Sequence, residues 1–161
     1  MRCYHLSNMY LSSIQAGLQS AHSQMELFVK YSGGTPKGVQ LYEWALNHKT
    51  MIILNGGFLS TMKEVLEFLD SEDNPYPWSV FYESEEAMGG MLTNIAIVLP
   101  EKIYETADLI RRRQIVPTLH ILPGQDEETI LKVVDQMKVY GRFSEFEIKM
   151  CNRLNNFGLA S

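Results

Sequence analysis

Three polar side chains near the start of the chain lie at helical spacing. Gln15, Gln19 and His22 are four and three residues apart, so a helix would carry them on or near one face. A histidine can exchange a proton near neutral pH, and a carboxamide can donate hydrogen bonds to a developing negative charge. The spacing therefore allows acid–base chemistry on a substrate. It equally describes the solvated side of an amphipathic helix.

A fourth candidate, Glu83, ends the segment WSVFYE. Its carboxylate could act as a base, or position a water, beside His22. The alternative is a charged strand end that begins a solvated acidic loop. For His22 the alternative is a structural histidine bonded to a strand or loop. Thr93 could line the same site, or fill a strand as β-branched residues commonly do.

The elements that must position these residues alternate between strand and helix. Strand-like composition is found at 2–6, 49–55, 78–83 and 92–99. A helix is expected from Ser12 or Ser13, either of which can cap it, to about Tyr31. Apolar residues recur at helical spacing within it, namely Ile14, Leu18, Ala21, Met25 and Val29. This alternation predicts an α/β fold in which helices pack on a mostly buried sheet.

Two further helix starts are expected from capping-box spacing, Thr61 with Glu64 and Ser144 with Glu147. After Pro100 the segments are mainly helical in pattern. We therefore expect an α/β core over residues 1–100 and a helical extension over 101–161. The extension is expected to pack on the core, so that the chain forms a single domain overall.

Composition limits the function classes. The chain has 161 residues, 45% hydrophobic and 20% charged, an ordinary globular mixture with a formal net charge of −5. A net negative charge does not favour binding to nucleic acid, although a local basic patch can bind nucleic acid even on an acidic protein. The two cysteines have no metal-site spacing, and no cofactor motif is present. No apolar run of about 18 residues and no leader pattern are seen, so a soluble cytoplasmic protein is expected.

The segment SNMYLSSIQAGLQSAH resembles the opening of the type 2 peptidyl-tRNA hydrolases, where a strand leads through a loop into a helix. Gln19 and His22 fall on the family's Gln and His, and Asn8 falls on its loop acid. The segment YPWSVFYESEEAMGGMLTNIAIVLP is similar to the family's later strands. The match covers Arg2 to Pro100 and is most like divergent, phage-type relatives with a helical tail. It implies a four-stranded mixed sheet flanked by helices.

The resemblance implies hydrolysis of the ester between peptide and tRNA, with a site built by Gln15, Gln19, His22 and Glu83. Gln15 stands where the family has its catalytic lysine, and no Lys or Arg occurs from Tyr4 to Val29. Glu83 stands near the family's Asp and is one methylene longer. These departures keep open a non-catalytic module of the same fold that binds RNA or a protein partner. A homo-oligomer, and a small-molecule or nucleotide-modifying enzyme that reuses the cleft, also remain alternatives.

The basic residues available for tRNA are few. The candidates are Lys30 and Lys37, which flank a glycine-rich loop, and the run Arg111, Arg112 and Arg113. The alternative for the arginines is a charge complement to the carboxyl end of a helix.

Overall fold

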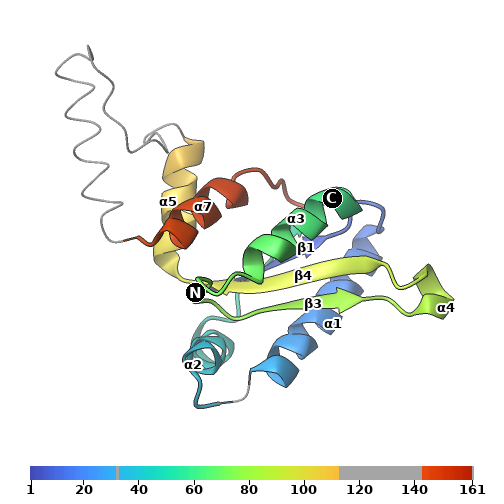
Figure 1. The fold of residues 1–161 in the computed structure, drawn as a ribbon, viewed down its shortest axis with the longest axis horizontal. Helices are drawn as coiled ribbons and strands as arrows, with labels where there is room; N and C mark the ends of the chain where they lie inside the picture. The colour runs from blue at the N-terminus through green and yellow to red at the C-terminus, as the bar shows by residue number, and fades with distance from the viewer. Residues whose placement is uncertain (32, 113–142, 161) are drawn as a thin grey trace, which may run out of the picture. The chain divides into compact units, whose positions relative to one another are not determined.

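The computed structural model describes residues 1–31, 33–112 and 143–160. The chain divides into two compact units, Met1–Pro100 together with Phe157–Ser161, and Glu101–Asn156. The first unit is an α/β structure built on one four-stranded open sheet (Figure 1). Within the described residues, no helix has both the length and the apolar character needed to cross a bilayer.

The sheet has the strand order β2-β1-β4-β3. Its strands are β1 (Arg2–Ser7), β2 (Met51–Asn55), β3 (Trp78–Tyr82) and β4 (Leu92–Leu99). β1 pairs in parallel with β2 and antiparallel with β4, which also pairs antiparallel with β3. The predicted mixed four-stranded sheet is therefore confirmed. All eight residues of β4 are buried, because β4 is a central strand with helices on both faces of the sheet.

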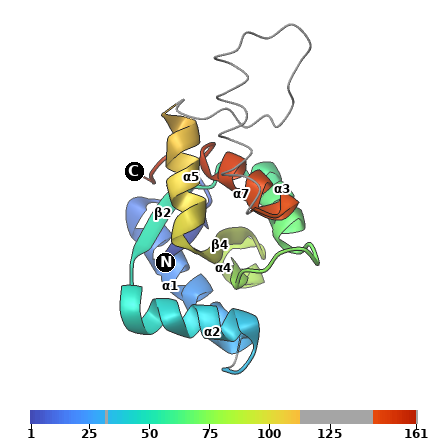
Figure 2. The same cartoon turned by 90° about the vertical axis from the view of Figure 1, so that its left-hand side faces the viewer.

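Two helices cover one face of the sheet, α1 (Ser13–Lys30) and α2 (Pro36–Glu43), which continues as the π-helix η1 (Trp44–His48). α3 (Leu59–Leu69) covers the other face (Figure 1). α2 lies beside α1 (Figure 2). The rings of Phe28 on α1 and Tyr42 on α2 meet edge to face. The short helix α4 (Glu85–Met88) lies in the connection between β3 and β4. One predicted helix start is wrong: α3 begins after Phe58 without a side-chain cap, so Thr61 and Glu64 form no capping box.

The buried face of α1 is unexpectedly polar. Its buried residues are Ala16, Gln19, Ser20, Ser23 and Leu27. The apolar residues whose spacing predicted the helix are instead exposed, with Ile14 at 77% and Met25 at 64%. The helix was thus predicted correctly, but its hydrophobic periodicity does not mark the face that packs on the sheet.

The last described residues of the chain protect the outer edge of the sheet. The backbone N–H of Asn55 donates to the carbonyl of Gly158 at 2.9 Å, and that of Ala160 donates to Ile53 at 3.1 Å. These bonds satisfy backbone groups that an edge strand such as β2 otherwise leaves open to pairing with another chain.

The second unit contains α5 (Glu101–Arg111) and α7 (Glu145–Leu154). Ser144 caps α7 through the predicted capping box with Glu147. Glu147 also forms an ion pair with Lys102 of α5 at 2.5 Å. The part of the predicted helical extension from residue 113 to residue 142 lies outside the described residues.

Candidate functional site

The amino end of α1 is fixed by Ser12 and Gln15. The Ser12 hydroxyl oxygen accepts from the Gln15 backbone N–H at 3.3 Å, and Gln15 Oε1 accepts from the Ser12 backbone N–H at 3.0 Å. This reciprocal capping box satisfies helix-end groups that have no partner within the helix. The carboxamide oxygen of Gln15 is therefore engaged in helix capping. Its NH2 group has no hydrogen-bond partner in the described part of the chain.

Gln19, one turn later, turns toward the sheet and is buried. Its Nε2 donates to Glu83 Oε2 at 2.7 Å, and its Oε1 lies 3.4 Å from the hydroxyl of Thr93 on β4. The Thr93 hydroxyl also lies within donating distance of the Phe81 carbonyl, at 3.3 Å. Because Thr93 can only donate to the amide oxygen, the contact orients the amide with its NH2 group toward Glu83.

Glu83 lies immediately after β3 and is half-buried. Its backbone N–H donates to the Met91 carbonyl at 2.9 Å, which holds it at the base of the connection to β4. Oε2 accepts from Gln19, and Oε1 lies 3.2 Å from the Ser84 backbone N–H. No cation of the described residues forms an ion pair with this carboxylate. It is held by neutral donors, which leaves its remaining lone pairs available to a water.

His22 lies exposed on α1, with its ring stacked on that of Phe81. The ring centroids are 4.6 Å apart and the planes are 11° from parallel. Phe81 is two residues before Glu83, so the stack keeps His22 on the same side of the first unit as the Gln19–Glu83 pair. Three of the four predicted residues, Gln19, His22 and Glu83, are thus gathered around β3. Gln15 lies one helical turn away in the capping box.

A buried polar network beneath α1 was not predicted from the sequence. His5 Nδ1 lies 3.3 Å from Asn94 Oδ1 and 3.1 Å from the Ser23 hydroxyl, and Nε2 lies 3.3 Å from Cys3 Sγ. Asn94 Nδ2 donates to the hydroxyls of Ser7 and Ser20 at 2.7 and 3.2 Å. Because an amide oxygen only accepts, its contact with His5 assigns the imidazole proton to Nδ1.

Burial lowers the pKa of His5 to about 4, an effect that the hydrogen bond with Asn94 partly opposes. The histidine is therefore neutral at physiological pH. It is also fully buried, so it has no access to a substrate. The sequence signals for this network were an asparagine inside the apolar strand LTNIAIVL and serines at helical spacing in α1. Asn94 is 71 to 89 residues away from its partners in the network, a separation that local patterns cannot connect.

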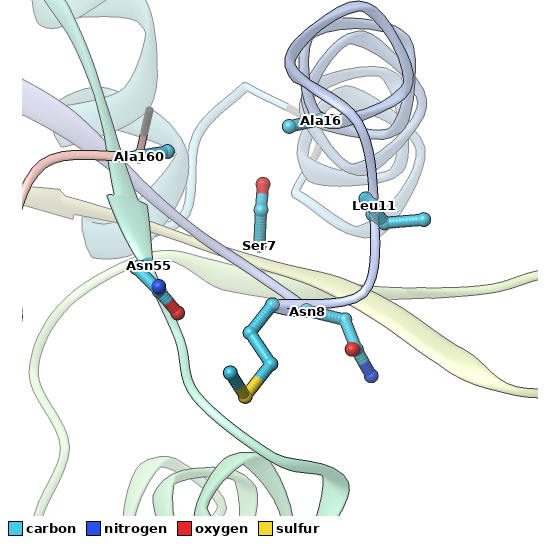
Figure 3. A pocket seen from close by; sticks show the side chains of 7 residues that line it. Ser7, Asn8, Leu11, Ala16, Asn55 and Ala160 are labelled. Atoms are coloured by element: carbon cyan, nitrogen blue, oxygen red, sulfur yellow. The ribbon is translucent and has the colours of Figure 1, made fainter.

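A cavity of about 50 Å³ lies at the carboxyl ends of the parallel strands β1 and β2 (Figure 3). It is lined by Ser7, Asn8, Met9, Leu11, Ala16, Asn55 and Ala160. Asn8, which stands at the family's acid position, donates through Nδ2 to the Leu92 carbonyl and accepts from the Tyr10 backbone N–H. The NH2 group of Asn8 therefore holds the β1–α1 loop to β4, and its carboxamide oxygen closes a turn within the loop.

The predicted basic residues are largely engaged within the protein. Lys30 Nζ lies 3.5 Å from the centroid of the Trp78 ring, a cation–π contact, and burial followed by the charge of Lys37 lowers the pKa of Lys30. Lys37 Nζ lies 5.9 Å from the Tyr31 ring centroid. Arg111 and Arg112 both form ion pairs with Asp108 of the same helix. Arg113 lies outside the described residues.

Within the described ranges, no group of three or more His, Cys, Asp or Glu residues has a metal-binding arrangement. No family model matches the chain, and no curated protein is similar enough in sequence to be matched.

Proposed function

We propose that this protein hydrolyses an ester that joins a peptidyl or aminoacyl group to RNA, in the manner of type 2 peptidyl-tRNA hydrolases. The observation that carries the proposal is the 2.7 Å hydrogen bond from Gln19 Nε2 to Glu83 Oε2. It joins residues 64 positions apart that the resemblance independently assigns to one site. His22 stands beside them through its stack on Phe81.

In this reaction Glu83 positions the attacking water. The Glu83 carboxylate accepts a hydrogen bond from the water. As the water oxygen attacks the ester carbonyl, the same carboxylate takes a proton from the water. The C–O bond to the RNA 3′ oxygen then breaks, and that oxygen leaves with a proton. The products are a free carboxylate and an RNA hydroxyl. Gln19 fixes one oxygen of Glu83, which lowers the entropy cost of placing the water.

His22 donates the proton that the leaving RNA oxygen takes. It is exposed and can reach a bulky substrate, and its stack on Phe81 limits the orientations of its ring. Gln15 supplies the amide hydrogens nearest the helix start for the oxyanion. A neutral amide stabilises an anion less well than an ammonium group does. The loss corresponds to about 2–4 kcal/mol in the transition state, the scale of one oxyanion donor.

The test is turnover of a peptidyl-tRNA by the purified chain, compared with Glu83→Gln and His22→Ala. Glu86→Gln is the matched control, because Glu86 is an exposed glutamate of the adjacent helix α4. The proposal requires measurable turnover that falls in both site variants and stays unchanged in the control. Absent turnover, or turnover unaffected by either site variant, contradicts it.

The second candidate is a binding module of the same fold without catalysis. It is favoured by Gln15, whose amide oxygen caps α1, and by the absence of Lys and Arg from Tyr4 to Val29. Such a module would bind RNA or a protein partner. The activity of the wild-type chain distinguishes the two candidates. If the wild-type chain is inactive and Gln15→Lys is active, binding is favoured as the native role. If the wild-type chain is active, the module without catalysis is excluded.

A further inference from the structure

The outward face of α1 is an apolar stripe. We define the α1 stripe as Ile14, Leu18, Ala21, Met25 and Val29. The four large members are 77%, 57%, 64% and 77% exposed in chain order. At about 100° per residue, they lie on the line opposite the buried face of the helix. Contiguous exposed apolar patches on proteins mark interaction surfaces more often than chance.

The apolar surface continues onto the neighbouring helix. Val39, Tyr42 and Leu46 are exposed at spacings of three and four residues along α2 and η1. The contact between the rings of Tyr42 and Phe28, 5.8 Å between centroids, joins this second set to the carboxyl-terminal half of α1. The apolar residues of the two helices are therefore linked through this ring contact.

We propose that a second copy of the chain covers this surface through an antiparallel contact between the two α1 helices. The order of residues in the stripe is self-complementary. When Ala21 of one copy faces His22 of the other, Leu18 faces Met25 and Ile14 faces Val29. Each large apolar side chain thus meets another, as a two-fold symmetric interface requires. The small Ala21 near the two-fold axis lets the helix backbones approach closely.

The charges and the area fit this occupant. The charged residues of α1 are Glu26 and Lys30, which in this register face Gly17 and Ser13 of the other copy. The two Glu26 side chains are then about 13 Å apart along the axis, beyond the roughly 8 Å screening length at physiological ionic strength. Seven exposed apolar side chains withdrawing roughly 100 Å² each offer nearly the ~800 Å² per partner of a standard interface.

The contact also borders the candidate site. His22 lies beside the two-fold axis in this register, while its ring stacks on Phe81. The α1 helix of the second copy would therefore form a wall next to the Gln19–Glu83 pair. The dimer itself does not depend on the proposed hydrolysis, because its argument rests only on the outward face of α1 and α2.

The first test is the mass of the purified chain in solution, measured by sedimentation equilibrium from about 1 to 100 μM, a range typical of moderate interfaces. The wild-type chain should have twice the mass of a single chain at the upper end. Leu18→Glu combined with Met25→Glu should raise the dimer dissociation constant at least 30-fold, because four carboxylates then enter an apolar contact. Leu159→Glu is the matched control, since Leu159 is 76% exposed and is not on either helix.

The second test establishes the direction of the helices. Ala21→Cys should form an intermolecular disulfide under mild oxidation, because residue 21 lies near the two-fold axis. Ile14→Cys alone should form no intermolecular disulfide, since its two copies are about 22 Å apart along the axis. A mixture of Ile14→Cys and Val29→Cys chains should cross-link, because these two residues face each other. The native cysteines, Cys3 and Cys151, are buried and give a low background. Far-UV circular dichroism checks that each variant is folded.

A wild-type chain that stays monomeric at the highest concentration overturns the proposal and leaves the stripe to a different partner. Equal dissociation by Leu159→Glu overturns it as well, since the effect would then be one of net charge. Cross-linking of Ile14→Cys as fast as Ala21→Cys overturns the antiparallel arrangement.

Discussion

Gln19 on α1 donates a 2.7 Å hydrogen bond to Glu83 at the end of β3. The bond connects the helix after the first strand to the connection after the third. Gln19 is buried, whereas Glu83 is half-buried, so the amide fixes one carboxylate oxygen from the inside and leaves the outer side open to solvent. Thr93 supports the arrangement from β4 through its contact with the amide oxygen.

We expect Gln19 and Glu83 to act as a unit in turnover. Gln19→Leu removes the donor and Glu83→Gln removes the carboxylate, so either change should lower kcat. The double variant should lose little beyond Glu83→Gln alone, because the role of Gln19 is to orient the carboxylate. A double-mutant cycle on kcat/KM should give a coupling of about 1 kcal/mol or more. Strict additivity would show that the hydrogen bond is only structural.

We expect Gln15→Lys to raise turnover and to lower stability. An ammonium group at this position stabilises an oxyanion better than an amide does, which predicts a roughly 30- to 1000-fold gain in kcat. The substitution also removes the carboxamide oxygen that accepts from Ser12, so unfolding should require about 1 kcal/mol less. Single-turnover kinetics and urea denaturation measure the two effects. Gln15→Met is the control, since it should lower stability similarly without raising turnover.

We expect the stability of the fold to decrease as the pH falls from about 6.5 toward 4. The pKa of His5 is lowered from 6.5 to about 4 by burial, so between these values the unfolded chain binds a proton that the folded chain excludes. The contribution of His5 to stability is therefore fully present above the pKa of His5 in the unfolded chain. It is lost as the pH falls toward the pKa of His5 in the folded chain. The loss is about 3 kcal/mol.

Urea unfolding at pH 7.5, 5.5 and 4.5 measures this dependence. His5→Gln should be less stable at pH 7.5 and should show a weaker decrease over the same window. His48→Gln should retain the wild-type decrease, because His48 is exposed on η1. An unchanged pH profile in His5→Gln would assign the decrease to other groups.

We expect Asn94→Ala to destabilise the fold strongly. Asn94 is fully buried, and its carboxamide bonds to His5, Ser7, Ser20 and Ser23. Truncation leaves several of these groups buried without partners, at a cost of about 3 kcal/mol. Asn47→Ala should cost less than about 0.5 kcal/mol, because Glu43 is the only partner of its exposed side chain among the described residues. Equal effects of the two substitutions on thermal unfolding would contradict the role of the network.

The sequence by itself determined the strands of the described sheet, their order along the chain, and the presence of α1 and α7. Strand composition located all four strands, serine capping located the starts of α1 and α7, and apolar spacing identified α1 as a helix. These signals are local: a cap, a turn or a repeat of 3.6 residues is complete within one segment. The start of α3 was placed wrongly because Thr61 and Glu64 have the spacing of a capping box without occupying the cap position.

The tertiary structure decided which face of α1 is buried. The periodicity of Ile14, Leu18, Met25 and Val29 predicts a helix, but periodicity alone does not say what covers the apolar side. In the first unit the sheet presents His5, Ser7 and Asn94 to α1, and buried polar groups require hydrogen-bond partners. The polar face of the helix supplies them, so the apolar face turns outward. The meeting of Gln19 with Glu83 follows from the same rotation of the helix, which no local pattern specifies.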